Sequence, residues 1–238
     1  VVLAKAYGST GAPTATAIQL TKNHFTAIGH GGQLSTFKAK VRNVGAKKAT
    51  MSFRGRTLGA YTSVADTTVT LGDSGTPYVD YAGLADNVAK TTFAVPAKAD
   101  RLQASIAYQG SSLDPAARDR LLLVDPRGRL AGTSLPQGVG NYGHTEVARP
   151  FAGTWTAYVL SRTTANGGSA GAVRFAASVA SYRSFGSVSP GKVTLAPGKS
   201  ATMTLTVKNP AKPRDASGAL LIASSVAGAH KPRTTSTV

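Results

Sequence analysis

Apolar and polar residues alternate over many short stretches of this chain. In residues 36–42, Phe37, Ala39 and Val41 share one face, and basic side chains occupy the other. The same period of two recurs in residues 101–109, 154–161, 173–179 and 202–207. This period is typical of half-buried β-strands, and no helical period persists beyond about two turns. The pattern predicts an all-β protein of antiparallel sheets.

Turn signals and composition agree with this fold class. Turn-forming residues separate the strands at Asp125–Gly128, Asn166–Gly168, Ala196–Lys199 and Asn209-Pro210. The chain has 28 Thr and 26 Gly but a single Glu, Glu146, whereas surface helices are usually rich in Glu. Its 238 residues, 42% hydrophobic, suffice for one large domain or for two to three small sandwiches. No apolar run approaches the roughly 20 residues of a membrane span.

The chain contains no cysteine. Disulfide scaffolds, thiolate zinc sites and cysteine nucleophiles are therefore excluded together. The absence does not place the protein in the cytosol, because many exported bacterial proteins fold without disulfides.

A weak internal repeat bears on the number of domains. Gly32–Asn43 aligns without a gap on Gly198–Asn209, 166 residues later, and both copies run from a glycine turn into a strand that ends in Val-basic-Asn. Two similar strands far apart in the sequence favour two small sandwiches flanking a different middle unit. We therefore expect sandwiches at residues 1–77, 78–184 and 185–228, followed by a basic tail at 229–238.

Two loops look like the nucleophile loops of serine proteases. Gly72–Pro77 resembles the trypsin-like Gly-Asp-Ser-Gly-Gly-Pro loop around Ser74, but the histidine and aspartate motifs that should precede it are missing. Gly132–Pro136 resembles a subtilisin-like loop around Ser134, yet no helix can begin after it, and such a serine normally opens a helix. We interpret both loops as turns and expect no catalytic residue in this chain.

Metal and cofactor chemistry has little support in the sequence. Four histidines are scattered without metal-ligand spacing, at positions 24, 30, 144 and 230. Four aspartates in the middle unit could supply oxygen ligands to Ca²⁺, but two of them, Asp114 and Asp125, precede prolines as ordinary turn openers. The four are Asp100, Asp114, Asp119 and Asp125. We expect no cofactor, with Ca²⁺ as the minority alternative.

Positive charge is the most distinctive physical feature of the chain. There are 27 Lys and Arg against 10 Asp and Glu, a net charge of +17. Such a field attracts polyanions and is screened by salt over about 8–10 Å. The densest cluster forms a candidate anion-binding patch of Lys38, Lys40, Arg42, Lys47, Lys48, Arg54 and Arg56. Neither interleaved aromatic residues nor a nucleic-acid-binding motif accompanies it, so we expect no specific nucleic acid partner.

The middle unit resembles a known family. Three stretches, Phe93–Leu102, Arg120–Leu130 and Pro150–Val159, are similar to the jelly-roll modules of the pre-peptidase C-terminal and P-domain type that are appended to secreted peptidases. The loop Asn141–His144 and the Gly-Thr-Trp-Thr strand resemble those of long actinobacterial subtilisin-like serine peptidases. In that family, immunoglobulin-like or fibronectin-III-like sandwiches often flank the jelly roll.

The resemblance implies the non-catalytic C-terminal region of a secreted subtilisin-like endopeptidase. Such a region would assist folding of the catalytic domain in the same precursor, or would position the enzyme on a protein substrate or an anionic cell-wall polymer. The alternative is a stand-alone extracellular binding or adhesion module for anionic polymers. A third hypothesis, an enzyme in its own right, needs a catalytic pair that the sequence does not assemble.

Overall fold

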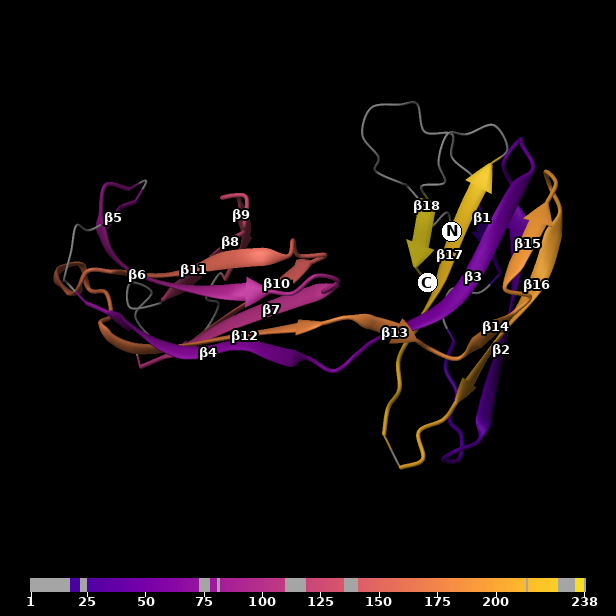
Figure 1. Ribbon diagram of the computed structural model, residues 1–238, viewed down its shortest axis with the longest axis horizontal. Coiled ribbons are helices and arrows are strands. Elements are labelled where there is room, and N and C mark those ends of the chain that lie inside the picture. The colour runs from indigo at the N-terminus through magenta and orange to yellow at the C-terminus, as the bar shows by residue number, and fades with distance from the viewer. Residues whose placement is uncertain are drawn as a thin grey trace. The chain divides into compact units, whose positions relative to one another are not determined.

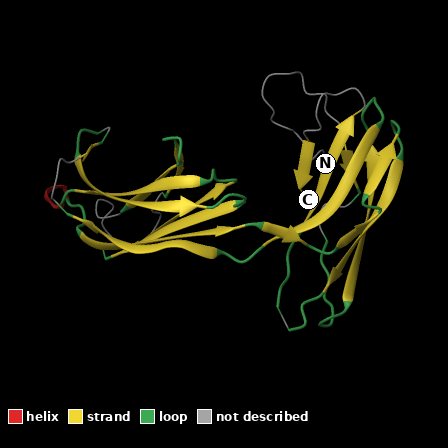
Figure 2. Ribbon diagram, viewed as in Figure 1, coloured by secondary structure: helices red, strands yellow, loops and turns green. Residues whose placement is uncertain are grey.

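The computed structural model describes residues 18–21, 25–72, 78–80, 82–109, 119–134, 141–212, 214–226 and 234–237. Almost every element in these ranges is a β-strand, and one short 3₁₀ turn, Thr164–Asn166, is the only helical element labelled in them (Figure 2). All the strand pairs are antiparallel. The predicted all-β fold class is confirmed.

The strands assemble into two compact units. Unit 1 consists of residues 1–58 and 182–238, and unit 2 of residues 59–181. Unit 2 is therefore inserted into the sequence of unit 1, which the chain leaves after residue 58 and re-enters at residue 182. The three consecutive ranges expected from the sequence repeat do not match this grouping, because strands from both ends of the chain share the sheets of unit 1.

Unit 1 is a sandwich of two sheets (Figure 1). The first sheet has the order β1 (Ile18–Leu20), β2 (Leu34–Asn43), β16 (Ser200–Lys208), β14 (Ser187–Ser189). The second has the order β13 (Tyr182–Ser184), β3 (Ala49–Leu58), β17 (Ala219–Val226), β18 (Thr234–Thr237), and β15 (Lys192–Leu195) also pairs with β3. The expected basic tail thus contributes a strand, since β18 pairs with β17.

The internal repeat marks two strands that lie side by side. β2 pairs with β16, with Arg42 opposite Ser200 and Leu34 opposite Lys208. Gly198 N–H donates to the Asn43 carbonyl (2.7 Å), and in the equivalent place Gly32 N–H donates to the Asn209 carbonyl (3.3 Å). The two copies are thus related by a local twofold within one sheet.

Alternation along the strands builds the core of unit 1. Val41 and Met51 are fully buried, and Ile222 and Met203 nearly so. The residues between them point outward, so each sheet has one apolar and one solvent-facing side. Asn43 is also fully buried, and its side-chain amide donates to the carbonyls of Lys47 (2.8 Å) and Leu195 (3.0 Å).

Unit 2 is a second pair of antiparallel sheets (Figure 1). One has the order β10 (Tyr142–Ala148), β7 (Arg101–Tyr108), β12 (Gly171–Ala180), β4 (Thr62–Leu71). The other has the order β5 (Tyr78–Val79), β6 (Ala85–Val95), β11 (Gly153–Arg162), β8 (Arg120–Val124), β9 (Leu130–Thr133).

Aromatic residues dominate the core of unit 2. Trp155 on β11 is 1% exposed, and its indole N–H donates to the Phe151 carbonyl at 2.8 Å. The Phe93 ring lies 6.4 Å from the Trp155 ring and 5.5 Å from the Phe175 ring. Ring pairs at these distances contribute beyond the area that they bury. The expectation that Trp155 is a core residue is confirmed.

Candidate functional site

The two units carry very different charge. Unit 1 contains 17 of the 27 basic residues and a single acidic residue, Asp215, a net charge of +16. Unit 2 contains the other 10 basic residues and nine acidic residues, a net charge of +1. Nearly all of the positive charge of the chain therefore belongs to one sandwich.

In the described part of unit 2, three arginines form ion pairs with aspartates. Arg174 binds both carboxylate oxygens of Asp66, at 2.9 and 2.7 Å, and Arg162 binds Asp80 at 3.0 Å. Hydrogen bonds from Arg174 hold the pKa of Asp66 below its usual value, and backbone hydrogen bonds from Leu84 and Ala82 do the same for Asp80. In unit 1, one carboxylate side chain is far too few to pair seventeen cations.

Three of the predicted patch residues form a straight row. Lys38, Lys40 and Arg42 are exposed on the outer side of β2, while Ala39 and Val41 between them are buried. Alternate residues of a strand lie about 6.6–6.8 Å apart, so the row repeats at that interval. We call these three residues the basic strip. Arg42 is anchored by its Nε, which donates to the Gly198 carbonyl at 3.2 Å.

Hydroxyl side chains line the basic strip on its β16 side. Lys38 faces Thr204 across the ladder, Lys40 faces Thr202, and Arg42 faces Ser200. Met203 and Val207 between them are buried, so their hydroxyl neighbours belong to the outer face. The next strand, β14, adds Ser189 opposite Thr204 and Ser187 opposite Thr206. We call Ser200, Thr202, Thr204 and Thr206 the hydroxyl column.

The other patch residues lie elsewhere in unit 1. Arg54 and Arg56 alternate with buried Met51 and Phe53, so they are on the outer side of the second sheet, across the core from the basic strip. The Arg56 guanidinium lies 4.0 Å from the centre of the Tyr182 ring. Exposed Lys47 and Lys48 occupy the turn between β2 and β3. The seven residues therefore divide between two faces and a turn, because consecutive strands belong to different sheets.

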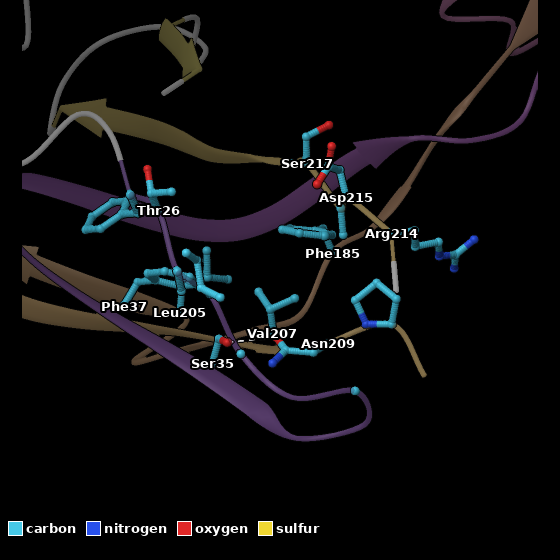
Figure 3. A pocket seen from close by; sticks show the side chains of 18 of the residues that line it. Thr26, Ser35, Phe37, Phe185, Leu205, Val207, Asn209, Arg214, Asp215 and Ser217 are labelled. Atoms are coloured by element: carbon cyan, nitrogen blue, oxygen red, sulfur yellow. Dashed lines mark hydrogen bonds between the residues drawn. The ribbon is translucent and has the colours of Figure 1, made fainter. Parts of the chain in front are cut away.

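A cavity of about 780 Å³ opens within unit 1. Its apolar lining comes from inward side chains of β2, β16 and β17 together with two loop phenylalanines: Phe25, Phe37, Phe185, Leu205, Val207 and Leu220. Figure 3 shows Phe37, Phe185, Leu205 and Val207 grouped around this space. Phe25 and Phe37 are in ring contact at 5.6 Å.

Polar residues fix one wall of this cavity. Ser35 Oγ donates to Asn209 Oδ1 at 2.7 Å, and the Asn209 amide donates to the His30 carbonyl at 3.1 Å. Asp215 and Arg214 are also at the lining, but Figure 3 shows the Arg214 side chain directed away from the apolar group. The cavity therefore offers both apolar and polar contact, and Lys212 joins Arg214 and Asp215 as its charged lining residues.

Two of the four aspartates considered as calcium ligands, Asp125 and Asp119, make hydrogen bonds within unit 2. Asp125 forms an ion pair with the Arg129 guanidinium (2.7 Å) and accepts backbone hydrogen bonds from Arg129 and Arg127. The Arg129 side chain, followed by these backbone N–H groups, holds the pKa of Asp125 below its usual value. Asp119 is fully buried and accepts a hydrogen bond from Ser169; burial raises its pKa. Asp100 lies before β7, and Asp114 is outside the described residues.

The structure describes the serine of one of the two protease-like loops. Ser134 is 1% exposed, and its Oγ accepts a hydrogen bond from the Leu121 N–H at 2.9 Å, a contact that joins β8 to the chain after β9. Its environment is structural. Ser74 lies outside the described residues, as do His24 and His230.

The structure brings together one group that sequence reasoning missed. On the outer face of the β10–β7 pair, Ser105 Oγ lies 3.1 Å from His144 Nδ1, and His144 Nε2 lies 3.6 Å from Glu146 Oε1. The group resembles a serine–histidine–acid relay, but β7 is paired on both sides, so its backbone amides are used in the ladders and are not free to stabilise an oxyanion. Only the strand register could reveal this contact, because Ser105 and His144 are 39 residues apart.

Within the described ranges, no group of three or more His, Asp or Glu side chains is placed to hold a metal ion. The same ranges contain no helix that is long and apolar enough to cross a membrane.

Comparison with known proteins adds little to this geometry. No protein-family model matches the chain, and no curated protein matches it either. Among solved structures, the chain is similar to the enzymatically active domain of tailspike protein 4 of bacteriophage CBA120, at 14% identity and a TM-score of 0.25. The match covers 54% of this chain and only 19% of that domain, too slight a likeness to support an argument about function.

Proposed function

We propose that this chain is a non-catalytic extracellular module that binds anionic polymers through unit 1. We further propose that it serves as the accessory C-terminal region of a secreted subtilisin-like serine protease. In that role it assists folding of the catalytic domain and holds the enzyme near its substrate or at a cell-wall surface. It acts without a cofactor.

The segregation of charge carries the first part of this proposal. Sixteen net positive charges on one sandwich repel one another and oppose folding, and solubility alone does not require them to be concentrated in one unit. A polyanion that lies against unit 1 would relieve the repulsion and release counterions. Unit 2, at +1, has the balanced surface of an ordinary domain.

Salt-dependent binding of the whole chain tests this part. We expect the 238-residue chain to bind linear polyanions at about 0.05 M salt and to lose most of its affinity by about 0.5 M. Neutralising three exposed cations of unit 2, with Lys90→Gln, Lys98→Gln and Arg127→Gln together, should leave the affinity unchanged. Binding that is absent at low salt contradicts the function, and a large loss in the unit 2 variant contradicts its assignment to unit 1.

The protease context rests on the resemblance of residues 93–159 to modules of secreted peptidases. Intact mass and sequencing of the native secreted protein test it. A product well above 24.2 kDa with a subtilisin-like domain before Val1 supports the accessory role. A product without such a domain favours the alternative of a stand-alone binding module.

A further inference from the structure

The outer face of the β2–β16–β14 sheet has an ordered pattern of side chains. The basic strip runs along β2, and the hydroxyl column runs beside it along β16. Neighbouring strands are about 4.7–4.9 Å apart, so each cation has a hydroxyl group within reach of the same ligand residue. Ser187 and Ser189 continue the rows onto β14.

The repeat of the basic strip selects a class of polymer. The backbone positions that carry its cations recur at about 6.6–6.8 Å along an extended strand. A linear phosphodiester chain with a three-carbon polyol between phosphates has six bonds per repeat, which span about 7 Å when extended, at up to ~3.6 Å per three bonds as in an extended peptide. Such a chain can set successive phosphates on successive cations. A polyanion with one charge per disaccharide has too long a repeat for this match.

The remaining side chains of the face favour a polyol over a nucleic acid. Recognition of single-stranded nucleic acids relies on aromatic side chains that stack on bases. The described positions of this face on β2, β16 and β14 are Leu34, Thr36, Lys38, Lys40, Arg42, Ser200, Thr202, Thr204, Thr206, Lys208, Ser187 and Ser189. They offer cations for phosphate and hydroxyls for hydroxyl groups, but no ring.

Arg42 is suited to the end of such a site. Its Nε is already bonded to the Gly198 carbonyl, which orients the guanidinium at the end of the strip, while the side chain stays exposed. A pre-oriented guanidinium binds phosphate through two parallel hydrogen bonds with less loss of side-chain freedom than a lysine.

We propose that this outer face binds a linear polyol-phosphate chain, with phosphates on Lys38, Lys40 and Arg42 and polyol hydroxyls on the hydroxyl column. The inference rests on the proposed polyanion-binding function and gives it a site and a ligand class. The polymer lies along β2, one repeat per two residues of the strand.

The charge test uses the full chain and poly(glycerol phosphate) as the probe. The variant Lys38→Gln/Lys40→Gln/Arg42→Gln should bind at least about 30-fold more weakly, with a salt slope lower by about 2. The matched control Lys48→Gln/Arg54→Gln/Lys192→Gln removes three charges of unit 1 away from this face and should change affinity by less than about threefold. Equal losses in both variants overturn the site but leave the polyanion-binding function standing. A wild-type chain that binds no polyanion overturns both.

The ligand-class test uses the hydroxyl column. Thr202→Val/Thr204→Val keeps side-chain shape and should weaken binding of poly(glycerol phosphate) about fivefold, the loss of one or two hydrogen bonds. It should leave binding of inorganic polyphosphate, which has no hydroxyl groups, unchanged. Equal effects on the two polymers contradict a role for the hydroxyls. Tighter binding of poly-dT than of poly(glycerol phosphate) contradicts the polyol class.

Discussion

Unit 1 and unit 2 share a plan of two antiparallel sheets around an apolar core, yet they differ in surface charge and in core composition. Unit 1 combines a net charge of +16 with a core in which aliphatic side chains and two methionines surround a single buried aromatic residue, Phe53, whereas unit 2 is almost neutral and has Trp155, Phe93 and Phe175 in its core. The layered fold therefore does not dictate the surface. The cations of unit 1 repel one another, whereas the charges of unit 2 nearly balance.

The chain provides separate probes for this comparison. Its only tryptophan, Trp155, and the buried Ile106 are in unit 2, and both methionines, Met51 and Met203, are in the core of unit 1. Tryptophan fluorescence and the Ile106 methyl signal therefore report on unit 2 alone. The methionine methyl signals report on unit 1.

The largest expected effect comes from the core of unit 2. Trp155→Ala should lower the free energy of unfolding of unit 2 by about 3–5 kcal/mol, because it leaves a large cavity and removes the ring contact with Phe93. The Ile106 methyl signal in a denaturant titration measures the change, with Trp155→Phe as the milder control. Methionine signals that shift with Ile106 to the same extent would show that the two units unfold as one, against the separation drawn here.

A smaller loss should come from the buried polar contact of unit 1. Asn43→Ala removes two amide hydrogen bonds and the Gly45 N–H contact (3.0 Å), and leaves buried carbonyls unsatisfied, at a cost of about 2–3 kcal/mol. Its twofold counterpart Asn209 is half-exposed, so Asn209→Ala should cost about 1 kcal/mol. The methionine methyl signals measure both. If Asn209→Ala lowers the free energy of unfolding as much as Asn43→Ala or more, burial does not strengthen the contribution of the Asn43 hydrogen bonds.

Acid should act on unit 2 and leave unit 1 almost unchanged. The pKa values of Asp66, Asp80 and Asp125 are lowered in the folded state, so their stabilisation is present above the unfolded pKa of about 3.9 and is lost as pH falls toward the folded values. Burial raises the pKa of Asp86 and Asp119, so their ionised forms destabilise the unit at neutral pH, and it gains stability as pH falls toward 3.9.

The stability of unit 2 should therefore peak near pH 4, about the unfolded carboxyl value, as measured by Trp155 fluorescence in denaturant. Asp119→Asn should reduce the gain in stability of unit 2 between neutral pH and pH 4, since it removes one of the two buried carboxylates whose pKa is raised. The methionine signals of unit 1, which has one acidic residue, should hardly move. If the stability of both units changes with pH to the same extent, the different numbers of acidic residues in the two units do not control their response to acid.

Local pattern was enough to predict the strands and their inward faces. The stretches 36–42 and 154–161 lie within β2 and β11, and the predicted inward residues Ala39 and Trp155 are buried. Alternation arises because one face of each strand packs on a core and the other faces solvent, so the sequence of that strand alone reveals it. The similarity of Gly32–Asn43 and Gly198–Asn209 was also a real signal, though of pairing within one sheet rather than of separate sandwiches.

Alternation within a strand does not show which strand is its partner. The similarity of the two stretches marked β2 and β16 as related, but it did not show that they pair in one sheet, 157 residues or more apart, or that unit 2 is inserted between them. The prediction of a single basic patch was incorrect in part for the same reason, because closeness in sequence does not show which sheet a residue belongs to. Lys40 and Arg54 are close in sequence, but the turn between β2 and β3 crosses from one sheet to the other. Charge density along a sequence therefore predicted the unit, while only the topology divided its charges between faces.

The smallest expected effect isolates the electrostatic strain of unit 1. Raising sodium chloride from about 0.01 to about 0.5 M shortens the screening length from about 30 Å to below 8 Å, which should stabilise unit 1 by on the order of 1 kcal/mol because its cations repel one another. In unit 2 the same salt weakens ion pairs such as Arg174–Asp66, so its stability should stay level or fall slightly. The methionine and tryptophan signals follow the two units in one titration, with sucrose as an uncharged control. If both units gain equally in salt, the stabilisation is a general solvent effect, and the concentration of charge in unit 1 carries no folding cost for a polyanion to relieve.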